Sequence, residues 1–353
     1  MNILVVRMRQ MGDAILSTSL LNTLRRNFPD ACIDFVLQER IAPLFEGHKS
    51  IDHIITFTDE ERHRPLAYMR KVHRIVSSTH YDIIIDMRST VNTMLFALLS
   101  PGSRYRIGLS KPYTWLAFSH RVVTSSDNRS IIDHDISFAL PLEGLRKIEP
   151  VRDFTLDITD AEVADFGQYL RSGGIDLSRP IMLANVTAKL ASKVWAEDRM
   201  TEVIQRFITH HPDWQVVFNY APGAEEANAR RIYSRLGAPR QVFIDIMARS
   251  PRQLAAMGHY LTLFFGNEGG ARHIMQASGC PSLVVCAPEN LKEVWIPQTG
   301  VLAEGISPMD FASPQQLSQM DREEQYGLVT ADAVWEKLEE MVISLQALPS
   351  PGL

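Results

Sequence analysis

Short apolar runs alternate with amphipathic stretches along most of the chain. Ile3–Arg7 has the length and composition of a buried strand, and Ala14–Arg26 carries leucines at helical spacing, with Pro29 just beyond its end. Strands that alternate with helices predict parallel sheets with right-handed crossover connections. The predicted strands are Ile3–Arg7, Cys32–Leu37, His53–Phe57, Tyr81–Asp86, Arg104–Gly108, Arg121–Val123, Pro180–Asn185, Trp214–Asn219, Gln241–Ile244, Leu261–Phe265 and Ser282–Cys286.

The alternation pauses near the middle of the chain. Glu149-Pro150 interrupts a helical run, and the polar segment Asp157–Asp160 follows it, after which the strand–helix pattern resumes. We predict an α/β protein with two Rossmann-like domains whose parallel sheets face a central cleft, an arrangement that suits a reaction between two substrates. The predicted boundaries are 1–150 for the first domain, 151–330 for the second, and 331–353 for a C-terminal helix and tail.

The composition is that of a soluble globular protein, with 45% hydrophobic and 22% charged residues among 353. A net charge of −5 gives no general attraction to nucleic acid. Three scattered cysteines, Cys32, Cys280 and Cys286, indicate core thiols in a reducing compartment, with neither a disulfide framework nor a zinc site. No signal peptide and no run long enough to cross a membrane is visible, so we expect a cytoplasmic protein.

Gly12-Asp13 lies in the turn between the first predicted strand and the first predicted helix. An aspartate there can act as an N-cap, because its carboxylate accepts hydrogen bonds from free helix N–H groups. It can also belong to a ligand site at the carboxyl end of a parallel strand. The local pattern leaves both interpretations open.

Two segments of the second half combine small or polar residues with a predicted strand end. NVTAKLASKVW contains Lys193, which can bind a diphosphate as a point charge or lie solvated on the surface. In FFGNEGGARHIMQAS, Gly269 and Gly270 precede a predicted helix whose free N–H groups favour an anion. The alternative is an ordinary tight turn with His273 in a packing role.

A third segment, YAPGAEE, places Glu225 and Glu226 after a predicted strand, where a carboxylate can bind ribose hydroxyls. The stretch Arg62–Arg74 is basic and contains no acid. Its spacing predicts a helix with an outward cationic face, either simply solvated or docking an acidic acceptor at a membrane surface. The predicted buried positions of this helix are Leu66, Met69, Val72 and Val76.

Several common chemistries have no motif in this chain. No G-x-G-x-x-G follows the first strand, and neither a Walker A lysine motif nor H-E-x-x-H is present. Asp133-His134-Asp135 has the D-x-D spacing that holds a divalent ion in some sugar transferases. It is one short motif, and we do not predict a metal site.

Together these segments resemble glycosyltransferase family 9, the ADP-heptose:lipopolysaccharide heptosyltransferases, over most of the chain. The opening block resembles that family's N-terminal block, including Gly12-Asp13, and Lys193 with Trp195 matches its lysine–tryptophan signature. The chain departs from the family where Glu268 replaces an aspartate and Gly269 a serine or threonine. Further matching segments are Asp86 in DIIIDMRST, Gly108 in YRIGL, YAPGAEE and GGARHIMQASGCPSLVV, and further departures are Ala196 for a proline and Cys286-Ala-Pro-Glu289 for a Gly-Pro-Thr/Ser turn.

The resemblance implies a GT-B fold and inverting, metal-independent transfer of a heptose from ADP-heptose to the lipopolysaccharide inner core. It implies no cofactor beyond the ADP-sugar co-substrate, and a peripheral location on the inner face of the cytoplasmic membrane. Asp13 would be the catalytic base, and Lys193 would bind the diphosphate and stabilise charge on the departing ADP. The implied donor-binding residues are Thr187, Glu225, Glu226, Glu268, Gly269, Gly270, Ala271 and His273, and the acceptor-binding residues are Gly12, Arg62, Arg64 and Arg70.

Two alternatives remain at this point. One is a GT-B transferase or epimerase that uses another nucleotide sugar. The other is a non-catalytic GT-B-like binding protein. Nucleotide preference and the need for an acceptor distinguish them.

Overall fold

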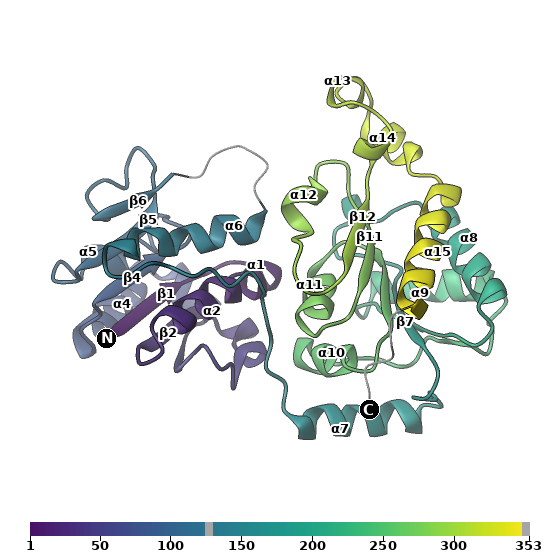
Figure 1. The fold of residues 1–353 in the computed structure, drawn as a ribbon, viewed down its shortest axis with the longest axis horizontal. Helices are drawn as coiled ribbons and strands as arrows, with labels where there is room; N and C mark the ends of the chain where they lie inside the picture. The colour runs from purple at the N-terminus through teal and green to yellow at the C-terminus, as the bar shows by residue number, and fades with distance from the viewer. Residues whose placement is uncertain (124–129, 348–353) are drawn as a thin grey trace. The chain divides into compact units, whose positions relative to one another are not determined.

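The structure is a computed structural model that describes residues 1–123 and 130–347. The chain divides into two compact units, Met1–Asp157 and Ile158–Leu353. Each unit is an α/β layer structure built on one parallel sheet (Figure 1). No helix in the described ranges is both long and apolar enough to cross a membrane.

The first unit contains a six-stranded sheet in the order β3-β2-β1-β4-β5-β6, with every neighbouring pair parallel. The central strands β1 and β4 are almost wholly buried, as expected for parallel strands covered on both faces. The strands are β1 (Asn2–Val6), β2 (Cys32–Gln38), β3 (His53–Phe57), β4 (Ile83–Asp86), β5 (Tyr105–Leu109) and β6 (His120–Val122). The helices are α1 (Met11–Leu16), α2 (Thr18–Asn27), η1 (Glu39–Phe45), α3 (Asp59–His63), α4 (Pro65–Ser78), α5 (Leu95–Leu98), α6 (Ile131–Ile136) and η2 (Ser137–Gly144).

The second unit contains another six-stranded parallel sheet, in the order β12-β11-β10-β7-β8-β9. Helices α8, α9 and α15 cover one face, and α10 and α11 cover the other (Figure 1). The strands are β7 (Ile181–Asn185), β8 (Gln215–Phe218), β9 (Val242–Phe243), β10 (Leu263–Asn267), β11 (Ser282–Val285) and β12 (Ala303–Ile306). The helices are α7 (Asp160–Ser172), η3 (Ala191–Lys193), α8 (Glu197–His210), α9 (Ala224–Arg235), α10 (Pro251–Gly258), α11 (Gly270–Ala277), α12 (Lys292–Trp295), η4 (Pro308–Asp310), α13 (Pro314–Leu317), α14 (Arg322–Leu328) and α15 (Ala331–Ala347).

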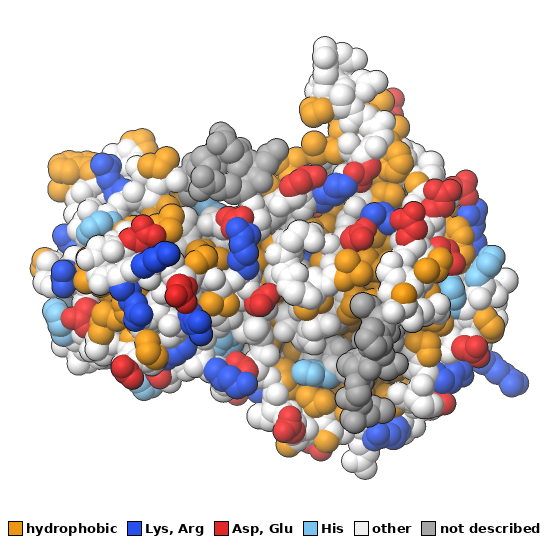
Figure 2. Space-filling view, viewed as in Figure 1, with side chains coloured by type: hydrophobic (Ala, Val, Ile, Leu, Met, Phe, Trp, Pro, Cys, Tyr) orange, Lys and Arg blue, Asp and Glu red, His pale blue; other side chains and the backbone are white. Residues whose placement is uncertain are grey.

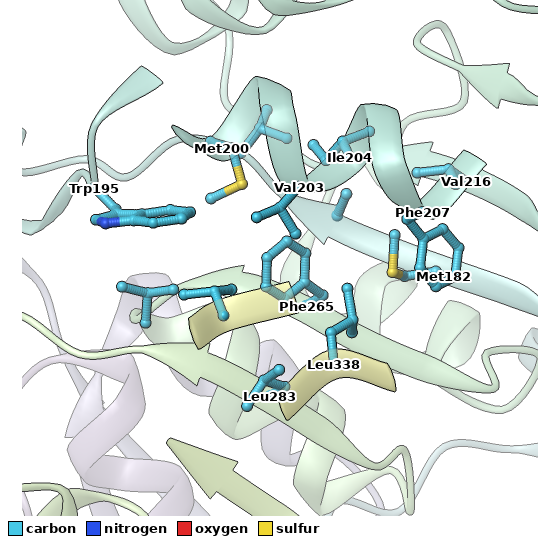
Figure 3. Close-up of a cluster of buried hydrophobic side chains, with 14 of the residues drawn as sticks. Met182, Trp195, Met200, Val203, Ile204, Phe207, Val216, Phe265, Leu283 and Leu338 are labelled. Atoms are coloured by element: carbon cyan, nitrogen blue, oxygen red, sulfur yellow. The ribbon is translucent and has the colours of Figure 1, made fainter. Parts of the chain in front are cut away.

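Each unit has a hydrophobic core cluster of its own. In the second unit, Trp195, Met200, Val203 and Phe207 converge on Phe265 of the central strand β10 (Figure 3). In the first unit, strand residues such as Leu4 and Ile84 pack against Tyr68 and Val72 of α4 and Phe96 of α5.

Every predicted strand overlaps an observed strand, so the predicted alternation is confirmed. The sequence pattern missed β12, whose AEGI segment lacks a continuous apolar run. The predicted helix over Ala14–Arg26 is interrupted at Ser17, whose hydroxyl donates to the Asp13 carbonyl. Within 331–353, the predicted C-terminal helix is α15, and residues 348–353 lie outside the described residues.

Of the two interpretations of Asp13, the N-cap is excluded, because α1 begins after Gln10 and Asp13 lies in its first turn. Part of the predicted buried face of α4 is wrong. Leu66 and Met69 are 66% and 43% exposed. Val72 is buried as predicted and Val76 is partly buried, while Tyr68 takes the inward position, with its ring centroid 5.0 Å from that of Phe57.

Candidate active site

Asparagine amides hold together the ends of three adjacent strands of the second unit: Asn267 ends β10, Asn185 ends β7, and Asn219 directly follows β8. Asn185 and Asn267 each donate a side-chain N–H to the other's backbone carbonyl, at 2.9 and 3.1 Å. Asn219 donates to the side-chain oxygen of Asn185 at 2.8 Å. The loops that follow these strands therefore start from fixed positions at one edge of the sheet, the edge where open α/β sheets bind ligands.

The loop after β7 is anchored by Trp195, the most voluminous fully buried side chain of the described chain. Its backbone N–H donates to the side chain of Asn267 at 2.7 Å, and its indole N–H donates to the Val329 carbonyl at 3.1 Å. Its ring lies against Met200 in the core (Figure 3). Trp195 therefore fixes η3, which ends at Lys193.

The Lys193 ammonium forms an ion pair with Glu268, at 2.6 Å between Nζ and Oε1. Glu268 directly follows β10, is 8% exposed, and also accepts a hydrogen bond from Asn290. Two residues predicted on separate loops are thus brought into contact. The pair leaves Lys193 about one third exposed and facing the same sheet edge as the asparagines.

The structure separates the two candidate ribose acids. Glu225 accepts a hydrogen bond from the Thr187 hydroxyl at 3.0 Å, which joins the first turn of α9 to the loop after β7. Glu226 forms an ion pair with Arg230 on its own helix, at 3.0 Å. Glu225 therefore belongs to the cluster at the sheet edge, whereas Glu226 is held by its neighbour on α9.

The glycine turn after β10 leads directly into α11. Gly270 and Ala271 are the first residues of that helix, and Gly269 precedes it. A side chain at Gly269 would meet no atom within 4 Å, so this glycine leaves open space beside the helix N-terminus. Gly266, which the sequence analysis passed over, has φ +136° and no room for a Cβ atom, which would lie 2.4 Å from the Asn185 carbonyl oxygen.

His273 and Arg272 lie buried in the first turns of α11. Burial lowers the pKa of His273 well below its usual value, so the ring is neutral at pH 7. Arg272 donates to Nδ1 at 2.7 Å, and therefore the ring proton of His273 is on Nε2. Arg272 also donates to the Trp295 carbonyl and to Gln276, so its guanidinium is held by groups of the fold, and burial lowers its pKa to about 10.

In the first unit, Asp13 lies at the carboxyl end of β1 beside two arginines. Its Oδ1 is 3.6 Å from the Arg7 guanidinium and 3.3 Å from that of Arg9. Arg7 is 1% exposed and also lies 3.5 Å from Asp135 of α6, which accepts a hydrogen bond from Ser17 at 3.1 Å. A buried guanidinium thus lies between two carboxylates, one in the first turn of α1 and the other on α6.

The second aspartate of the D-x-D motif, Asp135, is buried against Arg7, whereas the first, Asp133, pairs with Arg152 at 2.6 Å. The two carboxylates therefore have different partners. His134 between them bonds Asp135 at 3.0 Å. Both aspartates of the motif therefore form ion pairs with arginines of the first unit.

A cavity of about 450 Å³ opens at the carboxyl ends of β1 and β4. Arg62 lines it, together with His63, Arg88, Thr90 and Asn92. Of the predicted acceptor arginines, Arg64 is paired with Glu60 at 2.8 Å, and Arg70 is exposed on α4. Gly12 lies in α1 beside Asp13, and Arg88 is a cavity residue that the sequence analysis missed.

The basic stretch is balanced by acids that come just before it. Arg62 pairs with Asp59 at 2.9 Å, and Lys71 with Glu61 at 2.7 Å. Figure 2 shows acidic and basic side chains intermixed over the face that it draws. The stretch alone therefore gives no uniform cationic face.

The comparisons with known proteins agree with this architecture. A sequence model of glycosyltransferase family 9 (heptosyltransferase) matches residues 69–308. Lipopolysaccharide heptosyltransferase 3 of Escherichia coli K12 is 22% identical over 292 residues, which cover 78% of this chain and 79% of that protein.

Two solved structures share the fold. A family 9 glycosyltransferase from Veillonella parvula aligns with a TM-score of 0.78 at 18% identity, covering 98% of this chain and 96% of its own. An E. coli heptosyltransferase solved with ADP-2-deoxy-2-fluoro heptose aligns with a TM-score of 0.69 at 17% identity, covering 97% of this chain and 100% of its own. The fold is GT-B, as predicted. This chain belongs to glycosyltransferase family 9, the heptosyltransferases of lipopolysaccharide synthesis.

Proposed function

We propose that this enzyme transfers a heptose from ADP-heptose to the lipopolysaccharide inner core, with inversion at the anomeric carbon and without a metal ion. The proposal rests above all on the Lys193–Glu268 pair, which holds an ammonium group at the carboxyl edge of the β10-β7-β8 strands. A related heptosyltransferase of the same fold was solved with an ADP-heptose analogue, which supports the choice of donor.

In the proposed donor site, the diphosphate binds to Lys193 and to the N-terminus of α11. There the backbone N–H groups of Gly269, Gly270 and Ala271 face the diphosphate, and the neutral His273 donates its Nε2–H. Glu268 orients Lys193 until the diphosphate arrives. Glu225 and Thr187 bind the ribose hydroxyls, a role for which Glu226 is less suited because it is paired with Arg230.

In the proposed reaction, Asp13 removes the proton of the acceptor hydroxyl as its oxygen attacks the anomeric carbon. The bond between that carbon and the ADP oxygen breaks, and ADP leaves with the bonding electrons. Lys193 stabilises the negative charge that develops on ADP, a task that a metal ion performs in other transferases. Arg7 and Arg9 keep the Asp13 side chain beside the loop after β1.

The acceptor is proposed to bind in the first unit, in the cavity at the ends of β1 and β4. Arg62 and Arg88 suit a phosphate or carboxylate, while Thr90 and Asn92 suit sugar hydroxyls. Arg64 and Arg70 then lie outside this cavity and would contribute at most to contact with a membrane surface. We propose a peripheral location on the inner face of the cytoplasmic membrane, where such an acceptor is exposed.

The donor assignment is tested by thermal shift with ADP, UDP and GDP at equal excess. A nucleotide at 100 times its Kd stabilises the folded protein by about 2.7 kcal/mol. We expect ADP alone to raise Tm, and Lys193→Met to abolish that rise. Lys189→Met is the matched control, because Lys189 is an exposed lysine of the same loop.

A stronger response to UDP or GDP would overturn the donor and leave the family unchanged. If ADP is preferred, turnover with ADP-heptose and a truncated core acceptor follows, with and without EDTA. Loss of turnover in EDTA, at a temperature where circular dichroism shows the protein still folded, would contradict metal-independent transfer.

A further inference from the structure

Three potential metal ligands meet at the start of β2 and β3. Cys32 and Asp34 are two residues apart on β2, so their side chains lie on the same face of the sheet. His53 begins β3 and is the register partner of Asp34. The backbone pairing therefore brings a thiol, a carboxylate and an imidazole together.

The donor atoms of this cluster are already close to one another. Cys32 Sγ lies 3.6 Å from Asp34 Oδ1 and 3.6 Å from His53 Nδ1, and the latter two atoms are 2.8 Å apart. Ligand atoms bound at 2.0–2.3 Å to one tetrahedral Zn²⁺ lie roughly 3.3–3.7 Å apart. Both sulfur distances fall in that range. The carboxylate–imidazole distance is shorter than this range and must lengthen when the ion binds, and the His53 side chain, 67% exposed, has little packing to oppose that change.

The surroundings orient the ligands as in established zinc sites. The Tyr81 hydroxyl donates to the second carboxylate oxygen of Asp34 at 2.5 Å, which turns Oδ1 toward Cys32 and His53. Asp52, the other nearby carboxylate, accepts from the Ile33 N–H at 2.7 Å and from Arg25 at 2.5 Å, and it does not belong to the group of ligand atoms that lie within 4.8 Å of one another.

Cys32 differs from the other two cysteines of the chain. Cys280 and Cys286 are buried, whereas Cys32 is only partly buried and reaches the exposed His53. Burial and the Asp34 carboxylate raise the pKa of the Cys32 thiol, so a bound cation must displace its proton. The expectation that all three cysteines are core thiols is therefore wrong for Cys32.

We propose that Cys32, Asp34 and His53 bind one Zn²⁺, with water as the fourth ligand. The site lies at the amino ends of parallel strands, opposite the edge that carries Asp13, so it takes no part in sugar transfer. The ion joins the edge strand β3 to β2 and stabilises the first unit.

The test is a titration of the reduced full-length protein with ZnCl₂, followed by calorimetry and by Tm. We expect one Zn²⁺ per chain with a micromolar or lower Kd and a rise in Tm. Cys32→Ser and His53→Gln should each weaken binding by at least about tenfold and remove the rise in Tm. Cys280→Ala, which removes a buried thiol, and His63→Gln, which removes another histidine of the first unit, are matched controls and should bind as the wild type does.

Co²⁺ provides a second readout, because a cobalt–thiolate bond gives a near-ultraviolet charge-transfer band. The band should appear in the wild type and be absent in Cys32→Ser. The proposal is overturned by binding that survives in both ligand variants, or by the absence of stoichiometric binding at micromolar Zn²⁺.

Discussion

At the scale of single residues, Arg7 is the unusual group of the first unit, because a wholly buried guanidinium contacts both Asp13 and Asp135. A buried charge is tolerated when it is paired, and removal of one partner leaves that charge only partly compensated. Asp135, on α6, therefore shares Arg7 with the proposed base, which lies on α1.

Asp135→Asn should lower kcat by up to about 100-fold, because Arg7 then draws the Asp13 carboxylate out of position. The KM for the donor should be unchanged, since the proposed donor site lies in the second unit. Steady-state kinetics with varied ADP-heptose measure both constants. Asp133→Asn, on the same helix but paired with Arg152, is the control, and an equal fall in kcat there would show that Asp135 has no specific role.

Asp86 gives a pH-dependent prediction. Burial raises its pKa from 3.8 to about 6, and Arg88 and Ser89 donate backbone N–H groups to Oδ1. Between these pH values the folded protein holds a proton that the unfolded chain has lost. The free energy of unfolding should therefore fall as pH rises through this window, by up to about 3 kcal/mol.

Urea denaturation of wild type and Asp86→Asn at a series of pH values measures this contribution. Between pH 3.8 and about 6, the free energy of unfolding should decrease less in Asp86→Asn than in the wild type. The difference between the two decreases is the contribution of Asp86. Parallel pH dependences of the two proteins would show that Asp86 does not titrate in this range.

At the scale of elements, Gly266 near the end of β10 and Gly269 in the turn to α11 have opposite requirements. Gly266→Ala should destabilise the protein by about 2 kcal/mol or more, because its φ is +136° and its Cβ would strike Asn185. Gly269→Ala should change stability by less than about 0.5 kcal/mol, because its backbone is extended and its surroundings are open. Chemical denaturation of the two variants measures their free energies of unfolding. Similar losses of stability in both would contradict the structural explanation.

The sequence predicted the elements well where burial is continuous. Parallel strands covered on both faces are apolar runs, and every one predicted from such a run is present. The edge strand β12 was missed because Glu304 and Gly305 interrupt its apolar positions. The break at Ser17 was missed because leucine spacing continues across it.

The candidate site was predictable only in part. Strand-to-helix loops and the family resemblance pointed to Asp13, Lys193 and Glu268. The amide pairing of Asn185 with Asn267 spans 82 residues, and the contact of Arg7 with Asp135 spans 128. Such contacts depend on strand order, which periodicity does not specify. A recurring asparagine at strand ends was the one local signal available.

At the scale of the whole molecule, the proposed base and the proposed donor residues lie in different compact units. Asp13→Asn should therefore lose at least about 100-fold in turnover and keep the wild-type Kd for ADP. Lys193→Met should lose both turnover and ADP affinity. Calorimetric titration with ADP beside turnover assays separates the two effects. Weakened ADP binding in Asp13→Asn would contradict the assignment of the base and the donor site to different units.

The separate core clusters of the two units have an evolutionary consequence. Substitutions that repack one core leave distant packing in the other undisturbed, because energetic effects of well-separated sites are nearly additive. Selection can thus remodel the loops at one sheet edge while the other sheet keeps its geometry. Under the proposed assignment, a lineage of such enzymes can acquire a new acceptor and retain its sugar donor.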